Sequence, residues 1–164
     1  MSLATFHRLI TLLDAEQARY RVVEHASAGK SEEVARLRGT QLGQGAKGLV
    51  CHVKGNGIKC HVLAVLPADC QANLAALAQG LGGSRAALAS PAEVTALTDC
   101  VFGAIPPFSF HPDLLLVADP LLRERFDELA FNAGMLERSL ILASADYQRI
   151  AAPRWLPFAN LVTT

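Results

Sequence analysis

The stretch that decides the fold is residues 39–66, GTQLGQGAKGLVCHVKGNGIKCHVLAVL, in which a glycine-rich segment leads into two β-like runs. Residues 49–54 and 58–66 flank Asn56-Gly57, a dipeptide that favours a two-residue type I′ turn between antiparallel strands. This turn sets three pairs of residues opposite each other: His52 with His61, Val53 with Cys60, and Lys54 with Lys59. The stretch therefore predicts a β-hairpin with one basic face and one apolar face.

Lys47 is predicted to lie in a glycine-lined bend just before the first strand. Glycines at positions 43, 45 and 48 let the backbone turn tightly or approach a ligand closely, which suits an anion or an ester carbonyl. Residues 43–48 also match the pattern GxGxxG, but a dinucleotide-binding segment follows a strand and opens a helix. Here a strand follows instead, so we reject nucleotide binding. The alternative for Lys47 is a solvated loop lysine.

The hairpin places two lysines opposite each other and two histidines opposite each other, and each pair could bind a ligand. Lys54 and Lys59 repel each other when directly opposed, and phosphates of a partner would relieve this cost. The alternative is that both lysine side chains extend into solvent. His52 and His61 could contact one metal ion, but further convincing ligands are missing, so we expect no metal.

Composition sets the class of protein. With 164 residues, 51% of them hydrophobic and 18% charged, the chain is long enough for one core and short for two. We therefore expect a single domain spanning residues 1–164. No apolar run approaches the length of a membrane span and no cleavable leader is recognisable, which predicts a cytoplasmic protein. The four cysteines form no C-x-x-C pair, so they are expected to be reduced and mostly buried. We expect no cofactor.

Charge is unevenly distributed although the net charge is zero. Residues 1–60 carry 9 Lys or Arg against 5 Asp or Glu, and residues 61–164 carry 6 against 10. A basic half on a neutral protein suits transient contact with an anionic partner. An ordinary dipolar surface is the alternative.

The remaining chain alternates helix and strand signals. Periodicity and capping residues predict helices over residues 3–18, 31–39, 71–81, 90–97, 120–124 and 145–150. Runs of β-formers predict strands over residues 20–25, 85–88, 114–117, 128–131 and 139–143. The strand over 114–117 is entirely apolar and is therefore expected to be fully buried. Pro106-Pro107 makes residues 100–110 a rigid loop. The strand over 128–131 is expected to end at residues 132–134, whose sequence Asn-Ala-Gly is typical of a turn. The pattern predicts a single α+β domain with a mixed or largely antiparallel sheet surrounded by helices.

Several motifs coincide with one family. They are His25 before a Ser-Glu-Glu helix, Gly45-Ala46-Lys47 before a strand, LAVLP at 63–67 with Asp69, GAIPPF at 103–108, and Asn132-Ala133-Gly134. With these motifs the sequence resembles the YbaK/ProX-type aminoacyl-tRNA deacylases, which are related to the editing domain of prolyl-tRNA synthetase. The runs QGAK, VKGNG, LASPAEV, CVFGAIPPFSFHP, VADPLL and FNAGML resemble its YeaK-like branch over nearly the whole chain.

This resemblance implies a fold and an activity. The expected fold is that of the prolyl-tRNA synthetase editing domain, and the expected activity is hydrolysis of the ester that joins a wrong amino acid to tRNA. Lys47 falls on the essential lysine of the family. Gly103 and Pro107 fall on the ends of its GxxxP loop, which lines the pocket for the amino acid. The implied partners are mischarged aminoacyl-tRNA and an aminoacyl-tRNA synthetase. Neither DNA nor a membrane is an expected partner.

The candidate site residues follow from the motifs and the resemblance together. Lys47 and Gly103 are the expected catalytic residues, and Lys54 and Lys59 the expected tRNA contacts. The expected substrate-binding residues are His25, Ala104, Ile105, Pro106, Pro107, Phe108, Asn132 and Gly134. Structural roles remain open for three of these: a strand-end histidine at 25, core packing at Phe108, and a turn at Asn132. Phe108 and Phe110 are also candidates for stacking on the terminal adenine.

The chemistry requires no nucleophilic side chain. Aminoacyl esters are already activated, so an enzyme has mainly to hold the terminal adenosine, position a water and stabilise an oxyanion. Cys51-His52 and Cys60-His61 are strand neighbours that point to opposite faces, which makes them poor nucleophile-base pairs. The small to medium side chains at residues 104–106 favour serine, threonine or alanine as the amino acid removed.

Two other functions remain open from the sequence. One is a module of the same fold that binds tRNA or a synthetase without catalysis. The other is an esterase of small molecules, which needs no basic face and whose activity is insensitive to salt. The presence of both Lys47 and the loop at residues 103–107 favours the hydrolase acting on tRNA.

Overall fold

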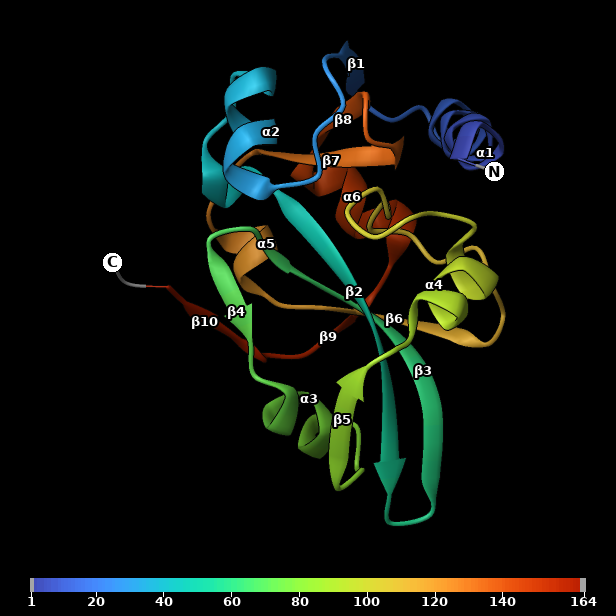
Figure 1. Ribbon diagram of the computed structural model, residues 1–164. Helices are drawn as coiled ribbons and strands as arrows, with labels where there is room; N and C mark the ends of the chain where they lie inside the picture. Colours follow the sequence, from blue (N-terminus) through green and yellow to red (C-terminus); the bar gives the residue numbers. More distant parts are fainter. Residues whose placement is uncertain (1, 163–164) are drawn as a thin grey trace.

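The computed structural model describes residues 2–162, and Figure 1 shows the arrangement of its helices and strands. The helices are α1 (Ser2–Ala15), α2 (Ser31–Arg38), α3 (Leu74–Gly80), α4 (Pro91–Thr98), α5 (Leu121–Glu124) and α6 (Ser144–Ala151), with a 3-10 turn η1 (Leu42–Gln44). Helices and sheets of both kinds of pairing confirm the mixed α+β class. None of the helices in residues 2–162 is long and apolar enough to span a bilayer.

A five-stranded mixed sheet, ordered β5-β2-β3-β6-β9, forms the centre. Its strands are β2 (Ala46–Gly55), β3 (Ile58–Pro67), β5 (Arg85–Leu88), β6 (Leu114–Ala118) and β9 (Arg154–Trp155). The β2–β3 register confirms all three predicted pairs. Asn56 and Gly57 take φ values of 54° and 79°, as a type I′ turn requires. The Asn-Gly signal therefore fixed the register of the longest strand pair.

Both faces of this sheet are covered, so β3 is buried along its second half. On one face, Val50, Leu63 and Val65 join the main hydrophobic core. On the other face, Val53, Val62 and Leu66 join a second core that includes residues of α3 and of the C-terminal segment. Alternation along the strands sends successive side chains to these two cores. This explains why residues 62–66 form a continuous apolar run.

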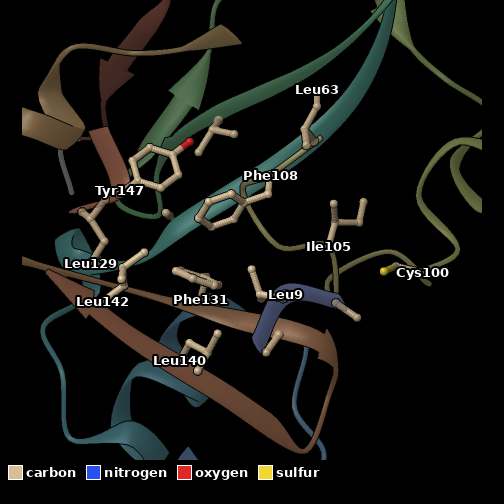
Figure 2. Close-up of a cluster of buried hydrophobic side chains, with 14 of the residues drawn as sticks. Leu9, Leu63, Cys100, Ile105, Phe108, Leu129, Phe131, Leu140, Leu142 and Tyr147 are labelled. Carbon is tan, nitrogen blue, oxygen red and sulfur yellow. The ribbon is translucent and has the colours of Figure 1, made fainter. Parts of the chain in front are cut away.

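A three-stranded antiparallel sheet, ordered β1-β8-β7, closes the main core from the other side. Its strands are β1 (Tyr20–Glu24), β8 (Arg138–Ala143) and β7 (Glu128–Met135). A two-stranded sheet of β4 (Cys70–Ala72) and β10 (Ala159–Leu161) completes the fold. Figure 2 shows the main core, with Phe108 inside a cluster to which Phe131 of β7 and Tyr147 of α6 also belong.

Local signals correctly located several elements. Ser90 caps α4, and the reciprocal hydrogen bonds of Ser90 and Glu93 form the predicted capping box. Gly39 ends α2 in the left-handed conformation, with φ of 71°. Residues 100–110 form a loop without regular structure, as the two prolines predict.

Four local predictions are wrong. β2 begins at Ala46, so Lys47 lies in a strand rather than in a bend. Residues 70–72 form β4, so the helix predicted over 71–81 begins only at Leu74, after the cap Asn73. Residues 132–134 are not a turn: β7 continues through them with a β-bulge between Asn132 and Met135. Leu115 is exposed, so the strand over residues 114–117 is not fully buried.

Candidate functional site

A pocket of about 360 Å³ lies where α2, the start of β2, the Gly103 loop and β7 meet. Four of the predicted site residues line it: Lys47, Gly103, Ile105 and Asn132. Gly29, Lys30, Glu32 and Phe102 line its exposed mouth, whereas Arg38, Gly45, Ala130 and Asn132 are buried at its deep end. The pocket therefore has a charged, open entrance and a closed end that carries one cation.

Lys47 is half-buried on the second residue of β2. Its ammonium donates one hydrogen bond, 2.7 Å long, to the carbonyl oxygen of Cys70. An ammonium has three donors, so this contact fixes the side chain while leaving protons for a ligand. Beside Cys70, Asp69 forms a two-pronged pair with Arg125 (3.0 and 2.6 Å), which holds the pKa of Asp69 below its usual range. The segment that orients Lys47 is thereby anchored.

Gly103 has a backbone conformation that favours glycine, with φ of +90°. A Cβ at this position would lie 3.4 Å from the Cα and carbonyl oxygen of Gly29, so the loop and the segment before α2 approach closely. The amide of the next residue, Ala104, is bonded to the Val101 carbonyl. The main chain of the loop is thus fixed beside the pocket.

Four polar side chains, two of which line the pocket, form a hydrogen-bonded network. We call it the Ser139 cluster: His25, Arg38, Asn132 and Ser139. The Ser139 hydroxyl lies 2.7 Å from Nε2 of His25, receives a hydrogen bond from Nη1 of Arg38 (3.2 Å), and donates to Oδ1 of Asn132 (3.0 Å). Nδ1 of His25 donates to the carbonyl of Ala26 (2.8 Å), because a carbonyl oxygen can only accept. His25 thus belongs to the cluster but does not line the pocket.

Asn132 connects the Ser139 cluster to the Gly103 loop. Its Nδ2 donates to the carbonyl oxygens of Gly103 (2.8 Å) and Ala28 (3.1 Å). A primary amide has two N–H donors, so both are used on the main chain. In this arrangement the Asn132 side chain holds the two segments that form the pocket wall, rather than pointing a free donor at a ligand.

The other predicted loop residues lie outside the pocket lining. Ala104 and Phe108 are buried in the main core, where the Phe108 ring packs edge-on against Tyr147 at 5.3 Å (Figure 2). Pro106 and Pro107 are buried next to them, and Gly134 donates its amide to the Ala104 carbonyl. Phe110 packs under Arg8, with 4.8 Å between the guanidinium carbon and the ring centre. The aromatic side chain at the pocket mouth is instead Phe102, which is 69% exposed.

Three of the four thiols are poorly suited to nucleophilic catalysis. Burial raises the pKa of Cys51 to about 11, and burial together with nearby Asp69 raises that of Cys70 to about 11. Burial also raises the pKa of Cys100. The thiolate is the reactive form, and at neutral pH it is scarce at all three positions. Nothing in the pocket lining supplies a serine–histidine or cysteine–histidine pair.

Three basic residues stand side by side on neighbouring strands near the hairpin tip. β2 pairs Lys54 with Lys59 of β3 on one side and with Arg85 of β5 on the other. We call Arg85, Lys54 and Lys59 the basic row. Lys54 lies roughly 23 Å from Lys47 along the extended strand. The basic row is therefore separate from the pocket.

The paired histidines of the hairpin do not assemble a metal site. The rings of His52 and His61 meet edge-on with their centres 6.5 Å apart, and Nε2 of His61 lies 3.8 Å from Oε1 of Glu93. Within residues 2–162, no group of three or more His, Cys, Asp or Glu residues is placed to hold a metal ion.

Comparison with known proteins identifies the family to which the chain belongs. The model of the aminoacyl-tRNA editing domain matches residues 25–150, which include the pocket and the Ser139 cluster. The chain belongs to this editing-domain family. The sequence resemblance and the fold class that it implied are both confirmed.

Relatives of the editing-domain family match almost the whole chain. A protein of Escherichia coli (strain K12) named multifunctional Ser/Thr-tRNA deacylase ProXp-y is 66% identical over 154 residues, covering 94% of this chain and 92% of that protein. The same protein of Escherichia coli O157:H7 matches equally. A crystal structure described as a candidate trans-editing enzyme for prolyl-tRNA synthetase superposes with a TM-score of 0.80. It covers 95% of this chain and 97% of its own at 22% identity, and so supports the editing-domain fold.

Sequence reasoning missed Arg38, Ser139, Phe102 and the third member of the basic row, Arg85. Ser139 lies opposite Asn132 in the β7–β8 register, so a correct register for that hairpin would have found it. The place of Arg85 beside Lys54 follows only from the pairing of β2 with β5, and the sequence carries no turn signal for that pairing. Arg38 lies four residues after Val34 and so shares the buried face of α2, a spacing that could have separated it from exposed Arg36. Phe102 was overlooked because Phe108 and Phe110 occupy the same aromatic-rich loop.

Proposed function

We propose that this protein hydrolyses the ester between a small, wrongly attached amino acid and tRNA, acting in trans after a synthetase has erred. The observation that carries the proposal is the 66% identity, over 92% of its length, to a protein named Ser/Thr-tRNA deacylase. The pocket supports it, since it brings Lys47 and the Gly103 loop together beside a charged entrance. In this proposal the protein works in the cytoplasm and receives its substrate from the synthetase that made the error.

The proposed reaction uses water rather than a protein nucleophile. The water oxygen bonds to the ester carbonyl carbon, the bond from that carbon to the ribose oxygen breaks, and a proton from the water ends on the ribose oxygen. The products are the free amino acid and tRNA with its terminal hydroxyls restored. Lys47 supplies the charge that stabilises the oxyanion or holds the terminal phosphate, and the Gly103 loop forms the wall against which the amino acid lies.

The pocket predicts which amino acids are removed. Its volume of about 360 Å³ is at the low end for ligand sites, and Ile105 packs next to Gly48 in its lining, with Cγ2 3.6 Å from the position that a Cβ on Gly48 would occupy. We expect seryl-, threonyl- and alanyl-tRNA to be hydrolysed faster than phenylalanyl- or tyrosyl-tRNA. The measurement is a panel of deacylation time courses in which the tRNA is kept constant and the amino acid varies. Faster cleavage of the aromatic substrates would contradict the proposed pocket, and tRNA binding without cleavage of any substrate would indicate a non-catalytic module.

The basic row predicts how tRNA docks. Replacing both Lys54 and Lys59 with alanine should raise the KM for tRNA and flatten its dependence on salt, because fewer phosphate contacts release fewer counterions. The single-turnover rate at saturating enzyme should change little. Each lysine is also replaced singly, and Arg21→Ala is the control for these single variants. It removes one exposed cation from β1, outside the central sheet. An unaltered salt slope in the double variant would mean that tRNA docks on another surface.

A further inference from the structure

Arg38 is a buried cation without a carboxylate partner. It is the last residue of α2, its side chain lines the pocket, and the residue is only 9% exposed. Within residues 2–162 it makes no ion pair, its Nε has no hydrogen-bond partner, and its Nη1 contacts only the Ser139 hydroxyl. Burial lowers its pKa to about 10, which still leaves it charged at neutral pH. A buried charge that lacks a partner is costly, and such residues concentrate at functional sites.

The guanidinium is placed at the closed end of the pocket. Nη2 lies 3.6 Å from the position that a Cβ on Gly45 would occupy, next to the strand that carries Lys47. A Cβ at 45 would also approach the Cβ of Ala68 to 2.9 Å, so any side chain at this position would crowd this end of the pocket. The Ser139 hydroxyl holds Nη1, which leaves the other edge of the guanidinium free of protein partners. Arg38 is therefore oriented before any ligand arrives.

The geometry of the substrate decides which of its groups reaches Arg38 at the closed end of the pocket. The tRNA is far larger than the pocket, so its ribose stays near the exposed mouth and the aminoacyl group points inward. The α-ammonium group carries a positive charge and is repelled by Arg38. A side-chain hydroxyl oxygen has two lone pairs and can accept a hydrogen bond from a guanidinium. Of the two groups on the α-carbon of a seryl ester, the hydroxyl side chain is the one that fits beside Arg38.

We propose that Arg38 donates a hydrogen bond to the side-chain hydroxyl of a seryl or threonyl group and so sets a preference for hydroxyl-bearing amino acids over alanine. This inference rests on the proposed deacylase function. Pocket size alone accepts serine, threonine and alanine together, since apolar pockets discriminate weakly between groups of similar size. A site built to hydrogen-bond a hydroxyl rejects the analogue that lacks it far more strongly, because its own donor is then left unpaired.

The test measures selectivity rather than rate. For wild type, kcat/KM should favour seryl- over alanyl-tRNA, and threonyl- over valyl-tRNA, by a factor on the order of 10² or more on the same tRNA. In Arg38→Met, which keeps a long side chain without donors, both ratios should fall to within about tenfold of one. Arg36→Ala is the matched control, because it removes an exposed cation from the same helix, outside the pocket lining, and should leave both ratios unchanged.

Each outcome has one meaning. If Arg38→Met slows all four substrates by the same factor, the guanidinium acts on the shared ester or phosphate and the inference is wrong. If wild type cleaves none of the substrates, the deacylase proposal fails instead. Thermal melts identify misfolding, and Ser139→Ala provides a second variant in which Arg38 stays but loses the hydroxyl that orients it. That variant should also reduce both ratios, and unaltered ratios in it would contradict the orientation by Ser139.

Discussion

Replacing Lys47 with alanine should slow single-turnover deacylation by a factor on the order of 10² or more, the size expected for the loss of one positioned electrostatic group. Lys47→Arg should not restore the rate. A planar guanidinium cannot take the place of a compact ammonium held 2.7 Å from the Cys70 carbonyl. The single-turnover rate at saturating enzyme, measured for wild type and both variants, tests this expectation.

The controls for Lys47 separate chemistry from folding. The side chain is half-buried and makes one hydrogen bond, so its truncation should cost about 1 kcal/mol of unfolding free energy. Lys59→Ala removes an exposed lysine from the paired strand and should leave the saturated rate near that of wild type. A Lys47→Ala rate close to wild type would remove this residue from the proposed mechanism. A slow rate accompanied by normal thermal stability would support its role.

Replacing Asn132 with alanine should damage both the fold and the rate. The substitution removes three buried hydrogen bonds, to the carbonyls of Ala28 and Gly103 and from the hydroxyl of Ser139. Unpaired buried groups cost about 1–3 kcal/mol each, so a loss of roughly 2–4 kcal/mol in unfolding free energy is expected after relaxation. Because the Gly103 loop is released, the single-turnover rate should fall on the order of 10²-fold.

A positioning role for Asn132 differs from a purely structural one. Below the melting temperature of the variant, kcat should fall while the KM for tRNA changes little, because the basic row is untouched. Asn160→Ala is the matched control, since Asn160 is an exposed asparagine on β10. Reduced stability with a wild-type rate would restrict Asn132 to holding the fold.

Local chemistry explains what the sequence predicted well. The Asn56-Gly57 turn fixes its own register, so the three predicted pairs of β2 and β3 followed from two residues. The Ser90 capping box similarly defined the start of α4. In both cases the deciding interactions lie within a few positions of one another. Such signals are independent of the rest of the fold.

Long-range contacts explain what the sequence could not predict. Arg38 reaches Ser139 across 101 positions and Asn132 reaches Gly103 across 29, so neither contact has a local signature. Lys47 was expected in a bend because glycines at 45 and 48 resemble a loop, yet pairing with residues 65–67 of β3 extends the strand over residues 46–48. The Asn-Ala-Gly run resembles a turn, but pairing with β8 keeps it in a bulged strand. Tertiary pairing overrides local propensity in each case.

The position of β3 in the central sheet also bears on synthesis of the chain. β3 pairs with β2 through a local turn, but its parallel partner β6 begins only at residue 114. At a translation rate of about 5–20 residues per second, the nascent chain waits roughly 2 to 9 seconds between completing β3 and beginning β6. Throughout this interval the apolar run at residues 62–66 has one open hydrogen-bonding edge, the kind of edge that templates aggregation. Correct folding during synthesis therefore depends on keeping that edge apart from other nascent chains until residues 114–118 emerge.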